Sequence, residues 1–277
     1  MIWKAAILVV LALISGGAPA HAADDPPPSP WEFEFAPYAW IPGTFGTITV
    51  HDVGAKADVT VKELLDIVTS GNGMAAGSYF GLRYDRFEAF ADGFGGFIKA
   101  GETLTVRTRL CTATIAGEVE TRPVFVDVGV GYRIGQWVIP GRQHPLTLGA
   151  YVGTRYTHIG TQINASRSVA NVGLRRAAAV SESFDWADPM LGVRTQVPLL
   201  DNVAFDFRGD IGGFDVSSKL IWGIVADLRY QMAWRPLSVH PYVSAGYRAI
   251  SLDHDFGAGS SADLQFRGPL SAFGFTF

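Results

Sequence analysis

Residues that could do acid–base chemistry gather near the end of the chain. The tripeptide Asp-His-Asp at 253–255 places an imidazole between two carboxylates, and Ser260 and Ser261 follow closely. With His158, these groups could supply a nucleophile and a general base if folding brought them within hydrogen-bond distance. No wider catalytic motif accompanies them. We therefore interpret them as solvated loop positions and assign no catalytic residue, with an enzyme or adhesin acting through such loops as the alternative.

The composition argues against cofactor, metal and nucleic-acid chemistry. Cys111 is the only cysteine, so the chain can form no internal disulfide. With no second cysteine and no paired histidines, we do not expect a zinc site of the Cys/His type. The glycine-rich stretch at 93–97 lacks the helix that a phosphate-binding loop requires. The formal net charge is −4, without blocks of one sign, which disfavours nucleic acid as a partner. We expect no cofactor and no bound metal.

Charged residues recur instead at alternate positions within apolar segments. Between residues 123 and 133, valine occupies positions 124, 126, 128 and 130, while Asp127 and Arg133 fall on the other face. Residues 203–211 and 222–230 alternate in the same way. Period two over eight to ten residues predicts β-strands with one apolar and one polar face.

The kind of polar residue favours a membrane barrel over a periplasmic sandwich. The polar face consists mainly of Gly, Arg, Asp and Tyr, and only four lysines follow residue 22. No later apolar stretch approaches 18 residues, which excludes transmembrane helices. Aromatic residues end the apolar faces of the strands, as in the girdles of transmembrane barrels, whose sheets must close in lipid. These aromatic residues are Trp31, Tyr84, Tyr132, Trp222, Tyr230 and Phe277.

In such a barrel the polar faces point into the lumen and form its charge network. Mixed signs allow most carboxylates to find a guanidinium, and arginine pairs in a two-pronged geometry. We expect either an ion-pair network that fills the barrel or a narrow charged path for small solutes, and poor conduction in both cases. The predicted inward charges are Arg83, Glu88, Asp92, Asp127, Arg133, Arg155, Asp188, Arg194, Asp206, Arg208, Asp210, Asp227, Arg229 and Arg248.

The N-terminus has the pattern of a secretory signal peptide. Lys4 precedes an apolar run, and Ala20-His21-Ala22 supplies the small residues of a cleavage site. We predict a cleaved signal peptide at 1–22, a disordered lead-in at 23–30 and one barrel domain at 31–277.

The last residues resemble the closing strand of bacterial outer-membrane proteins. Phe273, Phe275 and Phe277 alternate up to the C-terminus. The resemblance implies that they are the assembly signal, that the barrel-assembly machinery is a partner, and that the last strand closes against the first. Outer-membrane lipid is the other expected partner, and no loop partner can be named.

Four further motifs are similar to a family of small, largely uncharacterised outer-membrane β-barrels of Gram-negative bacteria. They are PYAWIPGTFGT (37–47), FDWADPMLGVR (184–194), FRGDIGGF (207–214) and GYRAISLDHDF (246–256). The resemblance implies the fold and an outer-membrane location, but no activity.

Turn signals predict about ten antiparallel strands, with eight or twelve as alternatives. Residues 46–60 and 103–117 also alternate and could form extra strands or extensions. Longer outward loops are expected at 41–73, 99–118 and 161–183. In the first loop, Thr60 and Glu63 have capping-box spacing before an amphipathic segment, so we predict a short helix that either plugs the mouth or packs on the rim.

Overall fold

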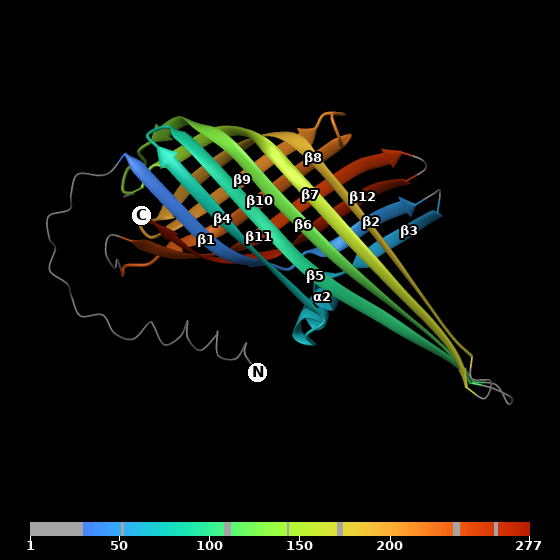
Figure 1. Ribbon diagram of the computed structural model, residues 1–277. Helices are drawn as coiled ribbons and strands as arrows, with labels where there is room; N and C mark the ends of the chain where they lie inside the picture. The colour runs from blue at the N-terminus through green and yellow to red at the C-terminus, as the bar shows by residue number, and fades with distance from the viewer. Residues whose placement is uncertain are drawn as a thin grey trace.

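The computed structural model describes residues 30–50, 53–107, 112–142, 144–170, 174–234, 239–257 and 260–277. The predicted signal peptide and Cys111 lie outside these residues. Ten antiparallel strands form a closed barrel, as the sequence predicts (Figure 1). The strands are β1 (Trp31–Trp40), β4 (Gly73–Tyr84), β5 (Phe87–Arg107), β6 (Thr112–Trp137), β7 (Leu146–Ala170), β8 (Leu174–Leu200), β9 (Val203–Gly213), β10 (Leu220–Gln231), β11 (His240–Gly257) and β12 (Ser260–Thr276).

The first and last strands pair to close the barrel. Phe35 lies opposite Phe275 in the antiparallel register. Beyond it, the backbones of Phe33 and Phe277 exchange two hydrogen bonds, with N–O distances of 3.3 and 2.9 Å. Because the first and last strands pair, the wall of the barrel has no open edge, and its backbone groups can hydrogen-bond to one another as a sheet in lipid requires.

One end of the barrel carries short connections and the C-terminus, and we call it the turn end. There β4 and β5 are joined at 85–86, and β8 and β9 at 201–202. The opposite, far end carries β2 (Gly43–Val50) and β3 (Val53–Val59), which form a hairpin. Beyond Trp40, β2 takes the place of β1 beside β12. Residues 46–60 therefore add a hairpin to the sheet but not to the ring of ten.

Strands β5 to β8 continue far beyond the others. The pairing of β5 with β6 continues from Lys99–Glu120 to Arg107–Thr112. The pairing of β6 with β7 reaches Thr112–Ala170, and that of β7 with β8 reaches Val169–Leu174. Figure 1 shows this ribbon projecting from the barrel. The long loops expected at 99–118 and 161–183 are thus mostly strand, because the antiparallel ladder carries on where the sequence alternation continues.

Helix α2 (Val61–Thr69) begins with the predicted capping box. The Thr60 hydroxyl oxygen accepts from the Glu63 backbone N–H, and the Glu63 carboxylate accepts from the Thr60 N–H at 2.8 Å. Leu64 is the buried residue of the helix, which contacts β4, β5 and β2. The helix therefore packs on the rim, at the place where β2 and β4 diverge. None of the described helices is long and apolar enough to cross a membrane.

The outer surface of the barrel is apolar. On β10, Leu220, Ile224 and Leu228 are outward and 50, 41 and 51 % exposed, on the same face as Trp222 and Tyr230. At the turn end, the rings of Trp31 and Tyr84 are in tilted contact, with their centres 4.6 Å apart. Such a continuous exposed apolar face would be exceptional in water. An apolar band with aromatic ends is the surface of a lipid-spanning barrel.

Candidate functional site in the barrel lumen

Most of the predicted inward charges gather in two layers, and the inner one is a buried central network. Arg155 donates to both carboxylate oxygens of Asp127, at 2.7 and 2.8 Å, and its Nη1 lies 3.1 Å from Asp210. Arg208 forms an ion pair with Asp92, and Arg248 Nη1 lies 3.4 Å from the same carboxylate. The central network consists of Asp92, Asp127, Arg155, Arg208, Asp210 and Arg248.

Tyrosines complete this network. The Tyr38 hydroxyl donates to Asp92 at 2.6 Å and accepts from Arg248 Nη1 at 2.7 Å. The Tyr151 hydroxyl donates to Asp210 at 3.2 Å. Buried charges need paired partners and additional hydrogen bonds to offset their lost hydration, and these hydroxyls supply such bonds.

A second layer of charge lies between the central network and the turn end. Arg229 bridges Glu34 and Asp206, at 2.8 and 2.6 Å. Arg83 binds Glu32 at 2.6 Å and lies 3.7 Å from Glu88. Arg194 also forms an ion pair with Glu88.

Sequence reasoning missed Glu32 and Glu34, although a signal was present. Trp31, Phe33 and Phe35 alternate with them in the first strand, which places the two glutamates on the inward face.

Three predicted charges lack the expected ion pair. Asp188 accepts from the backbone N–H and the hydroxyl of Ser218, at 2.7 and 2.6 Å. Asp227 accepts a hydrogen bond from the Ser244 hydroxyl. Arg133 forms no ion pair with any residue that the structure describes, and its Nη1 donates to Gln136 at 3.3 Å.

A large cavity of about 1110 Å³ lies at the turn end, and we call it the vestibule. Residues of the turn end line it, including Trp31, Asn202 and Phe277. Side chains of both charged layers also reach it, among them Arg248 and Arg229. The vestibule is thus a chamber that runs from the turn end up to the central network.

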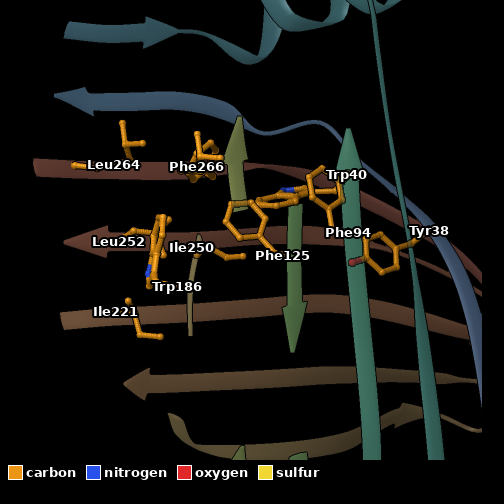
Figure 2. Close-up of a cluster of buried hydrophobic side chains, with 12 residues drawn as sticks. Tyr38, Trp40, Phe94, Phe125, Trp186, Ile221, Ile250, Leu252, Leu264 and Phe266 are labelled. Atoms are coloured by element: carbon orange, nitrogen blue, oxygen red, sulfur yellow. The ribbon is translucent and has the colours of Figure 1, made fainter. Parts of the chain in front are cut away.

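Above the central network, towards the far end, the lumen is filled by apolar side chains that we call the plug (Figure 2). On β11, Arg248 belongs to the network and Ile250 and Leu252 to the plug. The plug consists of Tyr38, Trp40, Phe94, Phe125, Ile159, Trp186, Ile221, Ile250, Leu252, Ala262, Leu264 and Phe266.

The plug crosses the lumen. Phe125 on β6 and Phe266 on β12 are separated by three strands around the wall, yet their ring centres lie 5.2 Å apart. Trp40 packs edge-on against Phe94, with centres 4.8 Å apart. Trp40 and Phe125 are both 0 % exposed. A side chain from one wall therefore touches the opposite wall, and the barrel is closed at this level.

The histidine cluster expected in solvated loops is distributed differently. His254 points inward, 7 % exposed and stacked on Trp186 with ring centres 4.6 Å apart. His158 contacts Asp185 on the outer surface at 2.7 Å. Asp253 alternates with His254 on its strand and faces outward. The barrel wall thus separates groups that the sequence places close together.

His254 lies near a serine, but the arrangement differs from a hydrolytic triad. The Ser218 oxygen is 3.1 Å from His254 Nδ1, and Asp188 binds Ser218 itself. In a Ser-His-Asp triad the carboxylate orients the histidine. Ser218 is 0 % exposed. The group therefore holds the β9–β10 turn over the plug.

No protein-family model and no curated protein matches the chain. Among solved structures, the outer-membrane protease OmpT from Escherichia coli matches 89 % of this chain and 96 % of its own, at 8 % identity and a TM-score of 0.42. Ail, the attachment invasion locus protein of Yersinia pestis, matches 89 % of this chain and 99 % of its own, at 12 % identity and a TM-score of 0.29. The outer-membrane protein OpdK from Pseudomonas aeruginosa matches 89 % of this chain and 99 % of its own, at 9 % identity and a TM-score of 0.22. These likenesses are too distant to transfer a residue role or an activity.

Proposed function

We propose that the chain is an outer-membrane β-barrel that is sealed to solutes, with a vestibule open to the periplasm. The apolar outer band supports insertion in lipid. Short connections are typical of the periplasmic side of such barrels, which supports assigning the turn end and the vestibule to that side. The alternative of an enzyme or adhesin acting through extracellular loops is not favoured, and the group around Ser218 lacks the arrangement of a hydrolytic triad.

The contact between Phe125 and Phe266 carries the proposal of a sealed barrel. Of the two expectations for the lumen, a charged path would need continuous polar space from mouth to mouth. The plug interrupts that space with close-packed apolar side chains, and each charge of the central network below it lies next to a charge of opposite sign. Ions entering the vestibule would lose their hydration at the plug without gaining a partner there.

The proposal also includes export to the periplasm and assembly in the outer membrane. The signal peptide would direct the chain to the periplasm, and the assembly machinery would read the terminal strand. Phe273 and Phe275 alternate on the outward face of β12, and Phe277 follows the strand in the same alternation. A lipid-facing signal there would be accessible until the barrel closes.

Thiol labelling tests the sealing and its direction. In a background with Cys111→Ser, Ala204→Cys places a thiol in the vestibule and Asp253→Cys places one on the outer surface near the far end. In intact cells, an impermeant maleimide too large for general porins should label position 253 and not position 204. Permeabilising the outer membrane should expose position 204. Equal labelling of both positions in intact cells would refute the proposal.

A further inference from the structure

One wall of the vestibule contains a hollow whose floor is made by two glycines. It is a small cavity of about 40 Å³, and Arg83, Arg133 and Arg194 lie around it. Gly131 and Gly149 occupy inward positions on the neighbouring strands β6 and β7. A cavity needs a volume of roughly 10–15 Å³ to hold one water molecule, so the hollow has room for a larger group.

Side chains at the two glycines would fill the hollow from below. A Cβ at Gly131 would lie 3.2 Å from the Ala150 carbonyl oxygen and 3.3 Å from Tyr151 Cβ. A Cβ at Gly149 would lie 3.2 Å from the Tyr132 carbonyl oxygen. The paired backbone beneath leaves little room for these atoms to move away, so the space depends on glycine at both positions.

The charges around the hollow are unbalanced. Glu88 is the one carboxylate among its lining residues, and Arg194 and Arg83 already share it. Arg83 also binds Glu32. A guanidinium has five N–H donors, and the contact of Arg133 with Gln136 uses one of them. Hydrogen-bond donors around the hollow therefore outnumber acceptors.

Carboxylates elsewhere in the vestibule already have partners. Glu34 and Asp206 are both held by Arg229, and Asp92 is held by Arg208 and Arg248. Asp227, on the opposite wall, is bonded to Ser244. The spare hydrogen-bonding capacity thus lies at Arg133, and it is suited to an anion.

We propose that Arg133 and Arg83 form a binding site for a small oxyanion, a phosphate or carboxylate group, above the floor made by Gly131 and Gly149. Arginine binds such groups with two parallel hydrogen bonds. The Thr147 side chain, which also lines the hollow, is placed to offer a hydroxyl. The inference rests on the proposed opening of the vestibule to the periplasm, from which the anion would enter.

Two sources offer this chemistry. A phosphorylated or carboxylated solute could enter through the vestibule. A phospholipid of the periplasmic leaflet could reach the rim from outside, because an apolar groove of about 560 Å³ runs along the lipid-facing side of the same wall, lined by Leu82, Phe87 and Tyr132 among others. The shared group is the phosphate, and the experiment separates the sources.

Calorimetric titration of the refolded barrel in neutral detergent tests the site with inorganic phosphate and with a short-chain phosphatidylglycerol. We compare the wild type with Arg133→Gln, with Gly149→Ala, and with a control, Arg142→Gln, in the exposed β6–β7 connection. Heat-modifiable migration confirms that each variant is folded. Gly149→Ala keeps every charge and fills the floor, so it separates a built site from a merely exposed guanidinium.

We expect saturable wild-type binding that weakens about tenfold or more in Arg133→Gln and in Gly149→Ala, and that is unchanged in Arg142→Gln. Binding of phosphate itself would identify a solute site, and binding of the lipid alone would identify a headgroup site. No saturable wild-type binding of either probe, or wild-type affinity in Arg133→Gln or Gly149→Ala, would overturn the proposal. Both mouths are accessible in detergent, so a leaking plug would not affect this result.

Discussion

Arg155 on β7 and Asp127 on β6 lie directly opposite each other in the strand register and form a two-pronged ion pair that is almost completely buried. The same guanidinium reaches Asp210 on β9. One side chain therefore ties together strands on different parts of the wall. A shift of β6 against β7 by one residue would break the pair between Arg155 and Asp127, so this pair specifies the register of the two strands.

Replacing Arg155 with Met should strongly destabilise the barrel. The variant leaves Asp127 and Asp210 buried without their shared cation, which we expect to cost about 3–5 kcal/mol. Urea unfolding in lipid vesicles measures the change. The control is Arg122→Met, whose exposed side chain pairs with Glu120 and should lose at most about 1 kcal/mol. Similar losses in the two variants would contradict the role of the buried pair.

Two arginine substitutions test which side chains of β9 point to the lipid and which to the lumen. Phe207 points outward and lies opposite Ala226, midway between Trp222 and Tyr230 on β10. Phe207→Arg should cost about 2–4 kcal/mol in lipid, because the charge would lie near the bilayer centre. Ala204→Arg places the same charge in the vestibule and should cost much less. Equal costs would show that the two faces are misassigned.

Deleting Phe277 should impair assembly in the outer membrane. The deletion removes the terminal aromatic residue and both of its backbone hydrogen bonds to Phe33. We expect a lower yield of heat-modifiable barrel in outer-membrane fractions, whereas Phe277→Tyr should assemble normally. Unchanged assembly of the truncated chain would exclude this residue from the signal.

The strands could be predicted from the sequence because each has its own period-two pattern. In the strand that ends at Phe277, the phenylalanines mark the lipid face, and alternation then places Leu264 and Phe266 inside. The plug could not be predicted in this way. Period two tells which residues share a face, but not which side chains from opposite walls meet.

The charge network was predictable in the same limited sense. The inward positions of Asp127 and Arg155 follow from alternation, and their pairing follows from the register of two neighbouring strands. The bond from Asp188 to Ser218 depends on how a six-residue turn folds back over the lumen. Two consecutive residues of that turn, Phe214 and Asp215, have positive φ values of 51 and 56°, which non-glycine residues seldom adopt.

Acidification should loosen helix α2. The Thr60 backbone N–H and hydroxyl donate to the Glu63 carboxylate and lower its pKa below the ordinary 4.5. Because the pKa is lowered, the hydrogen bonds of the Glu63 carboxylate stabilise the helix fully above pH 4.5. This stabilisation is lost as the pH falls through the pKa that Glu63 has in the folded protein. Hydrogen exchange of the α2 amides, corrected for intrinsic rates, should show falling protection in that range. Glu63→Gln should show no such pH dependence, and an identical profile in both proteins would contradict the capping role.

Single-channel recording in planar bilayers tests the sealed barrel most directly. The wild type should give no conductance steps above background, because Trp40, Phe125 and Phe266 close the lumen from wall to wall. The double variant Trp40→Ala/Phe125→Ala, which removes two of these side chains while keeping every charge of the central network, should conduct. Large, stable, porin-like steps from the wild-type protein would contradict the account.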